Sequence, residues 1–525
     1  MHLTDIQTQQ LLKSLPGRIG KVLDRWVEHS PDHVALREND VCWSYGEIQA
    51  VVAETRSWLI EQGVRPGDRV MLVCENCRAF VALFLALTEL DAWPVLVNAR
   101  LSTREVDVIR EHSGARRIIY MTSVSSHAQE HAGWAGAEII KVGRLGEIGL
   151  GALNESTVPQ PIDELEADRV VALIYTSGTT GQPKGVMLTH RNLLYIAAVS
   201  ARIRSLTPED RLYGVLPMSH AVGLSVVLLG TLLSGATLYL APRFDPMTAR
   251  TTLEKDRITI LLGVPSMFGQ FLQYAKLRKL ESLKFPALRI ISSSGAPLDL
   301  PTKQATEKLF GMILHNGYGI TECSPTVAQT RVEKPLETIS VGELLPGVEA
   351  RFVGPDQKEV PAGEIGELHV RGPNIMKGYY RAPEATAAAV DADGWFNSRD
   401  LARLENGDLF VVGRTKELIV RSGFNVYPVE VEAVLNAHVA VTRSAVIGRS
   451  IRGDEEVLAF VQPVPGSRVT VAELGEHAAQ HLAPYKRPSK IFLVDSMPLT
   501  PTGKVAKNEL AKIVAQYEGA AMASR

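Results

Sequence analysis

The stretch YTSGTTGQPKG, residues 175–185, places hydroxyl side chains and glycines just before a lysine. Backbone N–H groups and hydroxyls in such a loop can surround anionic oxygens, and the lysine adds positive charge. The Walker pattern requires a glycine at its sixth position and a hydroxyl after its lysine. Pro183 and Gly185 stand at these positions, so this is not a Walker loop. The residues alone leave two interpretations open, a different kind of phosphate loop and a polar turn.

Two further motifs follow in the chain, HNGYGITE at residues 315–322 and PTGK at residues 501–504. Together the three motifs resemble the adenylate-forming superfamily, which holds acyl-CoA synthetases, the adenylation domains of peptide synthetases, and luciferases. The resemblance extends from about Trp26 to Leu510. It implies that the loop at 175–185 holds the β- and γ-phosphates of ATP, which leave as pyrophosphate.

The resemblance implies a reaction in two steps that uses ATP, Mg²⁺ and coenzyme A. A carboxylate first attacks the α-phosphorus of ATP, and a thiol then attacks the acyl carbon and releases AMP. The first step brings an anion to a polyanion. It therefore needs a metal ion and fixed positive charge more than it needs a base.

The resemblance also implies which residues hold the nucleotide. Tyr318 is expected against the adenine with Asn316 at its edge, Thr321 at the α-phosphate, and Glu322 on Mg²⁺, which prefers carboxylate oxygen. The loop SSSGAPL, residues 292–298, is expected to line the adenine through Ser294, Gly295, Ala296 and Pro297. The phosphate loop comprises Thr176, Ser177, Gly178, Thr179, Thr180, Gly181 and Lys184.

Five residues nearer the C-terminus complete the set of expected site residues. Asp400 matches the carboxylate that binds both ribose hydroxyls, and Arg414 is expected to reach the same ribose. Lys416 falls at the hinge, and Gly423 beside the pantetheine tunnel. Lys504 is expected to bridge the substrate carboxylate and the α-phosphate, a role that suits a point charge on a flexible stem. One site then serves two unlike reactions, so the small domain is expected to swing.

One position departs from the superfamily's pattern. Arg399, directly before Asp400, stands where the usual form carries glycine. Two explanations are open: the glycine is not needed for a positive φ, or the loop shifts.

The segment LPMSHAVGL, residues 216–224, resembles the one that enters the acyl pocket. Amino-acid-activating relatives carry an aspartate here, whereas this chain has Ala221 and Val222 after His220. A buried ammonium without a partner is costly, so amino acids are disfavoured as substrates. His220 is expected to be a wall or gate residue rather than a base. The remaining acyl-pocket candidates are Met267, Phe268, Gly317, Pro325 and Val327.

These pocket candidates are small or apolar, which predicts an apolar monocarboxylic acid, either aromatic or a medium-to-long fatty acid. They contain no arginine or lysine for a second carboxylate, so dicarboxylates are disfavoured. Coenzyme A is the expected acceptor, and the alternative is a stand-alone enzyme that loads a carrier protein. A non-catalytic nucleotide-binding protein and a luciferase-like oxygenase are the rival classes. Retention of Lys504, Glu322 and the phosphate loop disfavours the first.

Strand-length apolar runs alternate with amphipathic helices, a pattern that predicts α/β architecture with parallel sheets under helices. Short strands and Gly/Pro turns after about residue 340 predict a β-rich module. The expected division is an N-terminal AMP-binding domain, residues 1–413, and a mobile α+β domain, residues 414–525, with its hinge near 414–416. The uncharged run at residues 221–241 is expected to form a buried helix and a strand rather than a membrane span.

Composition narrows the partners further. The 525 residues include 56 basic and 58 acidic side chains, a balance without the electrostatic footprint of nucleic-acid binding. Four cysteines and no apolar leader predict a cytoplasmic protein without disulfides. The expected partners are small molecules, and both a monomer and a homodimer are open.

Overall fold

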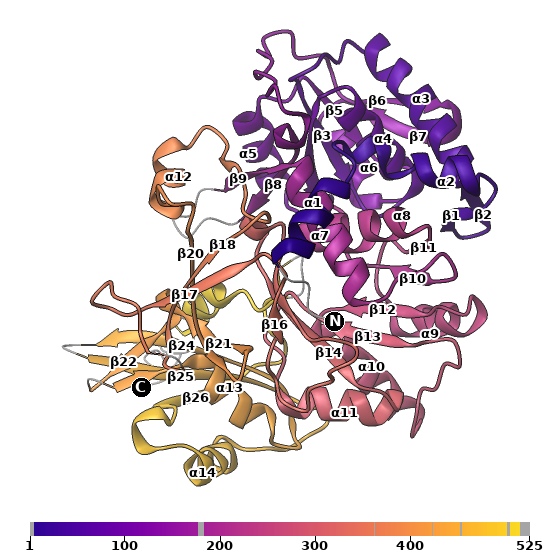
Figure 1. The fold of residues 1–525 in the computed structure, drawn as a ribbon. Helices are drawn as coiled ribbons and strands as arrows, with labels where there is room; N and C mark the ends of the chain where they lie inside the picture. The colour runs from indigo at the N-terminus through magenta and orange to yellow at the C-terminus, as the bar shows by residue number, and fades with distance from the viewer. Residues whose placement is uncertain are drawn as a thin grey trace.

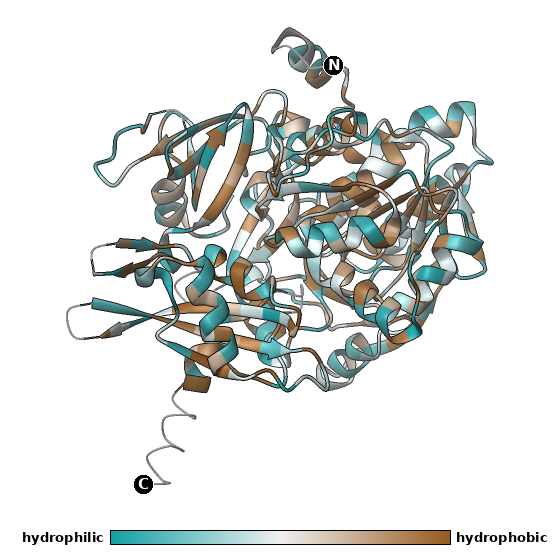
Figure 2. Ribbon diagram, turned by 90° about the horizontal axis from the view of Figure 1, so that it is seen from below, coloured by the Kyte–Doolittle hydropathy of each residue, from teal (hydrophilic) through white to brown (hydrophobic). Residues whose placement is uncertain are grey.

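The computed structural model describes residues 5–176, 183–361, 363–422, 424–451, 454–500 and 504–514. A large N-terminal α/β domain carries a smaller C-terminal α+β domain at one end (Figure 1). Hydrophobic residues concentrate in the strands and the helices packed on them, and hydrophilic residues face outward (Figure 2). The expected fold class is therefore confirmed.

The first sheet of the large domain has nine strands, and its centre, from β14 through β13, β12, β10 and β11 to β1, is parallel. Its outer pairs β1–β2, β14–β15 and β15–β16 are antiparallel, so the sheet is mixed rather than purely parallel. In spatial order its strands are β16 (Glu343–Leu344), β15 (Thr326–Gln329), β14 (Leu314–Gly319), β13 (Ile290–Ser293), β12 (Ile260–Gly263), β10 (Arg211–Gly214), β11 (Thr237–Leu240), β1 (Val34–Glu38) and β2 (Val41–Ser44).

The second sheet has eight strands, again with a parallel centre, β5–β3–β4–β8, and antiparallel edges. In spatial order its strands are β19 (Gly378–Tyr379), β9 (Lys184–Thr189), β8 (Val170–Thr176), β4 (Trp93–Asn98), β3 (Arg69–Cys74), β5 (Arg117–Tyr120), β7 (Gly146–Leu150) and β6 (Glu138–Val142). Helix α4 (Arg78–Glu89) contacts β1 of the first sheet and β3 and β4 of the second. It lies between the sheets, which explains why ten of its twelve residues are buried.

The predicted β-rich module is a four-stranded antiparallel sheet of β17 (Glu349–Val353), β18 (Gly366–Arg371), β20 (Phe396–Glu405) and β21 (Asp408–Arg414). The C-terminal domain has its own apolar core, which includes Ile419, Val446 and Leu474. Its strands are β22 (Ile419–Arg421), β23 (Phe424–Val426), β24 (Val441–Ile451), β25 (Asp454–Pro463) and β26 (Lys490–Leu493), with helices α13 (Pro428–Asn436) and α14 (Val471–His481).

Local signals start and end the helices of the large domain. Ser44 and Ser102 each form a capping box with a glutamate three residues on, at α3 and α5, and Gly114 ends α5 in the left-handed conformation. The remaining helices of eight or more residues are α1 (Asp5–Ser14), α3 (Tyr45–Glu61), α5 (Thr103–Ser113), α6 (Ser126–Trp134), α7 (His190–Ile203), α9 (Pro246–Lys255), α10 (Pro265–Arg278) and α11 (Leu300–Phe310). The shorter helices are α2 (Asp24–His29), α8 (Gly230–Ser234), α12 (Pro383–Ala389) and the turns η1 (Ile19–Val22), η2 (Gly143–Leu145), η3 (Glu166–Asp168), η5 (Thr321–Cys323), η6 (Thr415–Glu417) and η7 (Pro484–Lys486).

The uncharged run at residues 221–241 folds as expected, into buried helix and strand. Its helical part is a π-helix, η4 (Val222–Leu229), followed by α8, and its strand is β11. A Cβ at Gly223 would lie 2.1 Å from the carbonyl oxygen of Pro217, so only glycine lets η4 begin so close to the preceding loop. In the described part of the chain, no helix is both long and apolar enough to cross a bilayer.

Candidate active site

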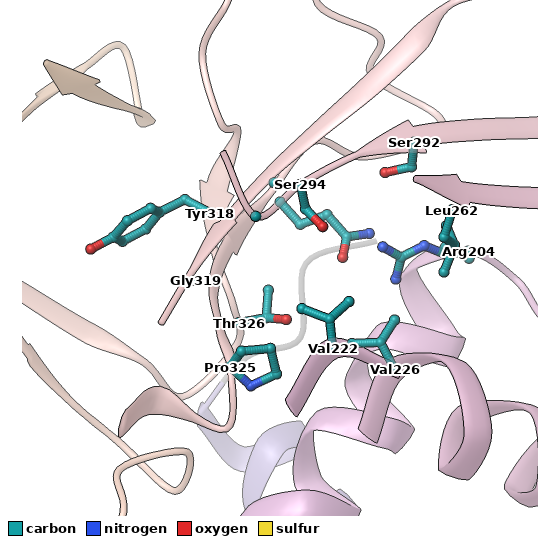
Figure 3. A pocket seen from close by; sticks show the side chains of 13 residues that line it. Arg204, Val222, Val226, Leu262, Ser292, Ser294, Tyr318, Gly319, Pro325 and Thr326 are labelled. Atoms are coloured by element: carbon teal, nitrogen blue, oxygen red, sulfur yellow. The ribbon is translucent and has the colours of Figure 1, made fainter. Parts of the chain in front are cut away.

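A pocket opens at the carboxyl ends of β12, β13 and β14, where ligands bind in open α/β sheets. Helix η4 forms one wall of this pocket, and Tyr318 and Arg204 lie at its opposite ends (Figure 3). Its lining residues are Arg204, Val222, Val226, Leu262, Ser292, Ser294, Gly295, Gly317, Tyr318, Gly319, Pro325, Thr326 and Gln329. The cavity between these side chains is about 30 Å³.

The pocket includes six of the residues predicted from sequence, Val222, Ser294, Gly295, Gly317, Tyr318 and Pro325. It leaves out others. Met267 and Phe268 are buried in the first turn of α10, where Phe268 packs edge-on against Phe310. Val327 is fully buried in β15. Ala296 and Pro297 directly follow the lining residue Gly295 on the loop after β13, but they do not line the pocket themselves.

At one end of the pocket, three predicted nucleotide residues form a hydrogen-bonded group. The Tyr318 hydroxyl donates to Asp400, and Nε of Arg414 donates to Oδ1 of Asp400 at 2.8 Å. Asp400 and Arg414 face each other across β20 and β21. Asp400 is 2% exposed, and burial raises the pKa of its carboxyl although Arg414 opposes the shift. Burial and the neighbouring Asp400 also raise the pKa of Tyr318.

The conformation of Arg399 contradicts the first of the two explanations, that a positive φ is not needed there. Its φ is +60°, so the left-handed conformation that favours glycine is kept and the arginine adopts it. The loop is held in place, because Asn397 Oδ1 accepts from the Arg399 backbone N–H at 2.9 Å and Ser398 Oγ accepts from that of Asp400 at 3.1 Å.

A second group lies where the metal and phosphates are expected. Glu322, in η5, accepts a 3.0 Å hydrogen bond from the Tyr379 hydroxyl, and Nζ of Lys184 lies 4.8 Å above the Tyr379 ring. Thr176 and Lys184 are paired across β8 and β9, at the two ends of the proposed phosphate loop. Thr321 begins η5 beside Glu322. The loop residues Ser177, Gly178, Thr179, Thr180 and Gly181 lie outside the described residues.

Lys504 brings the C-terminal domain to this site. Its ammonium interacts electrostatically with Asp400 and Glu322, which favour its charge, and with Arg414, which opposes it. Removal from water and Arg414 together lower the pKa of Lys504. Its backbone is held by Thr500, whose N–H donates to the Lys504 carbonyl at 2.7 Å. Lys416 lies in η6, directly after β21, and Gly423 is outside the described residues.

Two predicted residues have surroundings that limit their roles. Asn316 donates through Nδ2 to the carbonyls of Ile339 and Ser340, so its amide nitrogen already holds a neighbouring loop. Burial and Lys504 lower the pKa of His220 to about 4, and its buried Nε2 has no hydrogen-bond partner among the described residues. His220 is therefore neutral near pH 7, as a wall residue would be.

The sequence analysis missed Tyr379 and the far half of the pocket. Val226 follows Val222 by four residues on one helical wall, a spacing that could have identified it. Leu262 and Gln329 join the pocket through strand ends that no motif marks, whereas Ser292 belongs to the predicted loop at 292–298 and Thr326 to the predicted acyl-pocket stretch at 325–327. Arg204 corrects a prediction: the pocket does contain an arginine, contributed from the end of α7 rather than from the expected stretches.

Comparison with known proteins shows two family matches. The AMP-binding enzyme model matches residues 23–380, and the AMP-binding enzyme C-terminal domain model matches residues 430–504. The chain belongs to the AMP-binding enzyme family. It is 36% identical over 489 residues to a feruloyl-CoA synthase from Amycolatopsis sp, covering 92% of this chain and 96% of that protein. It is 32% identical over 492 residues to 4-coumarate–CoA ligase 5 from Oryza sativa subsp. japonica, covering 90% of each.

Solved structures agree with this family. ATP-bound MatB from Rhodopseudomonas palustris matches with a TM-score of 0.81 and 30% identity, over 94% of this chain and 98% of that one. The o-succinylbenzoate coenzyme A synthetase MenE from Bacillus subtilis, in complex with ATP and a magnesium ion, matches with a TM-score of 0.80 and 29% identity, over 94% and 99%. The AMP-binding enzyme described here is thus an AMP-forming acid–thiol ligase of the acyl-CoA synthetase group, and it uses ATP, Mg²⁺ and coenzyme A.

Proposed function

We propose that this enzyme activates an aromatic carboxylic acid and transfers it to coenzyme A. A carboxylate oxygen attacks the α-phosphorus of ATP, the bond to the β-phosphate breaks, and pyrophosphate leaves. The sulfur of coenzyme A then attacks the acyl carbon, and AMP leaves with the oxygen that joined the two. The carrying observation is that Lys504 of the C-terminal domain interacts electrostatically with Asp400 and Glu322, and that Asp400 is hydrogen-bonded to Tyr318 at one end of the pocket.

The nucleotide is held by the group at Tyr318. Asp400 accepts both ribose hydroxyls, and Arg414, which already donates to the same carboxylate, keeps Asp400 charged and oriented. Tyr318 presents its ring to the adenine while its hydroxyl anchors the ring to Asp400. Lys504 places a positive charge between the attacking carboxylate and the α-phosphate, where negative charges must approach each other.

Glu322 fits the magnesium ion that the family uses. Its carboxylate is a hard oxygen donor and lies beside Lys184 at the mouth of the proposed phosphate loop. Magnesium supplies charge that offsets the developing negative charge on the phosphate oxygens. Tyr379 orients Glu322 through its 3.0 Å hydrogen bond, so we assign it a positioning role.

The two half-reactions use two arrangements of the domains. Residues 1–413 form the stationary part and residues 414–525 the moving part, with a hinge at 414–416 that includes Lys416. β21 ends at Arg414, and the separate apolar core of the C-terminal domain begins at Ile419, which supports a joint between them. Rotation carries Lys504 away after adenylation and brings the loop at Gly423 to the acyl group.

The substrate is aromatic rather than aliphatic. Relatives of similar length are named for feruloyl-CoA and 4-coumarate, and Val222, Val226 and Leu262 provide apolar walls for a ring. Medium or long fatty acids are the alternative substrates that the apolar walls alone would admit. Coenzyme A is favoured over a carrier protein as acceptor, since the named relatives are CoA synthases and ligases.

A substrate panel tests the proposal. Purified enzyme with Mg-ATP is given benzoate, 4-coumarate, ferulate, C4 to C16 fatty acids and amino acids, with and without coenzyme A. We expect thioester formation that requires coenzyme A and is fastest with an aromatic acid. Fastest turnover with a fatty acid would contradict the aromatic assignment. Pyrophosphate release that stops at a bound acyl-AMP despite coenzyme A would favour a carrier-protein acceptor.

A further inference from the structure

Arg204 is a buried charge that the fold does not neutralise. The residue is 7% exposed and directly follows α7. Its Nη1 donates to the carbonyl of Ser200 at 3.2 Å and to the Ser200 hydroxyl, while its buried Nε has no acceptor in the part of the chain that the structure describes. Throughout the described ranges, no carboxylate forms an ion pair with it. Burial lowers the pKa of Arg204 to about 10, which leaves it charged at neutral pH.

Another buried arginine shows how this chain satisfies a purely structural one. Arg69 is 1% exposed, and each of its side-chain nitrogens donates to a backbone carbonyl, among them those of Ser113 and Gly67. An arginine offers five N–H donors, and leaving them unmade in a buried place costs free energy. Arg204 uses one nitrogen where Arg69 uses three, so its site is under-supplied with acceptors.

The free donors of Arg204 face the acyl pocket. Its guanidinium points into the pocket from the end opposite Tyr318, with Val222 and Val226 along the wall between them (Figure 3). Ser292 and Gln329 also line the pocket. An acid whose carboxylate lies toward the nucleotide would therefore direct its far end at Arg204.

We propose that Arg204 is a specificity-determining residue that binds an oxygen acceptor at the far end of the acid. This inference rests on the proposed function and narrows it to oxygenated substrates. The acceptor is a phenolic oxygen or a second carboxylate, which share the ability to accept from a guanidinium fork. A hydrocarbon end would close the pocket on the donors of Arg204 and leave them without water or partner.

The inference is tested with three acids that differ only at the ring position opposite the acrylate: 3-phenylacrylate, its 4-hydroxy form and its 4-carboxy form. For the natural enzyme we expect kcat/KM for at least one oxygenated acid to exceed that of 3-phenylacrylate by about 10- to 100-fold, as for a charge-assisted hydrogen bond. The form that is favoured identifies the acceptor as phenol or carboxylate.

The decisive variant is Arg204→Met, which keeps an apolar stem as far as the position of Nε but removes every donor. This variant should bring the ratio of kcat/KM between the oxygenated acid and 3-phenylacrylate to near one. It should do so mainly by lowering kcat/KM for the oxygenated acid. Arg202→Met, an exposed arginine on α7 two residues away, is the matched control and should keep the natural ratio. Arg204→Gln, which retains an amide donor, should restore part of the preference and serves where the methionine variant does not fold.

A natural enzyme without preference for oxygenated acids, or a folded Arg204→Met enzyme that keeps the preference, would overturn the inference while leaving the proposed function intact. The same three acids are also compared by isothermal titration, which needs no turnover. Acid binding that depends on Arg204 would support the inference even if no thioester formed, and such a result would count against the proposed function alone.

Discussion

Replacing Asp400 by asparagine separates its ribose contact from its structural contacts. The carboxylate is almost fully buried and accepts from Arg414 and Tyr318. The side chain of Arg414 is 52% exposed, so its guanidinium regains water when the partner charge is lost. The cost to folding should therefore be about 1 kcal/mol rather than the about 3–5 kcal/mol of a fully buried broken pair.

The cost to ATP binding should be larger. A hydrogen bond to a charged acceptor contributes about 1.5–3 kcal/mol, and one between neutral groups about 0.5–1.5 kcal/mol. Two ribose hydroxyls that lose a charged acceptor therefore lose about 2–3 kcal/mol together, which corresponds to about 30- to 150-fold weaker binding.

Isothermal titration with ATP and with 2′,3′-dideoxy-ATP isolates this contribution. The natural enzyme should bind the dideoxy nucleotide far more weakly than ATP, and Asp400→Asn, whose amide makes only neutral hydrogen bonds, should discriminate between the two nucleotides about 30- to 150-fold less. Glu405→Gln, at the far end of the same strand, is the control, because its side chain is 52% exposed and away from the site. For each enzyme, the loss of affinity from ATP to the dideoxy nucleotide is measured. A loss in Asp400→Asn equal to that in the natural enzyme would refute the ribose assignment.

Three further predictions follow from particular contacts. Lys504→Ala should slow adenylation by about 10²–10³-fold, as loss of a charge aimed at the transition state does, yet spare thioester formation from supplied acyl-AMP. Lys512→Ala, at an exposed lysine, is the control. Equal loss in both half-reactions would contradict the role of Lys504 in adenylation. Arg399→Gly should raise the free energy of unfolding by about 0.5–1 kcal/mol, since relief of about 1–2 kcal/mol of left-handed strain exceeds the entropy cost of glycine; a lower unfolding midpoint would count against it. Burial lowers the pKa of His190 to about 3, so the folded protein keeps this residue neutral where the unfolded chain would protonate it. The contribution of His190 to the free energy of unfolding is therefore complete above about pH 6.5. It should be lost at up to about 1.4 kcal/mol per pH unit as pH falls toward 3. His190→Asn should therefore lose less stability than the natural enzyme between pH 7 and pH 5 in urea titrations, and parallel losses would disprove the assignment.

Sequence reasoning placed Tyr318, Asp400 and Arg414 in one site because short motifs mark them, and the structure joins these residues by hydrogen bonds; their contacts with a nucleotide stay a prediction. Tyr318 and Glu322 lie four residues apart on one strand end and turn, and Asp400 and Lys504 each sit in a motif of their own. The short motifs therefore identify the residues of the site from sequence. The parallel strands then bring the loops that carry them to one edge of the sheet.

The acyl side was less predictable because tertiary packing builds it. Arg204 reaches the pocket from the end of α7, and Gln329 from the antiparallel strand β15 next to the sheet edge, and neither position carries a local pattern. Met267 and Phe268 were expected in the pocket from their apolar character, which a core position explains equally well. Backbone conformation was also hard to predict from residue type. An arginine at position 399 did not by itself reveal the positive φ that the residue adopts.

The central claim is that the substrate carboxylate attacks the α-phosphorus of ATP before a thiol receives the acyl group. The most direct measurement uses 4-coumarate labelled with oxygen-18 in both carboxylate oxygens, with Mg-ATP and coenzyme A, followed by mass spectrometry of the products. We predict one oxygen-18 in AMP, one in the thioester carbonyl and none in pyrophosphate. Unlabelled AMP in the presence of thioester, or label in a phosphate released together with ADP, would contradict the account.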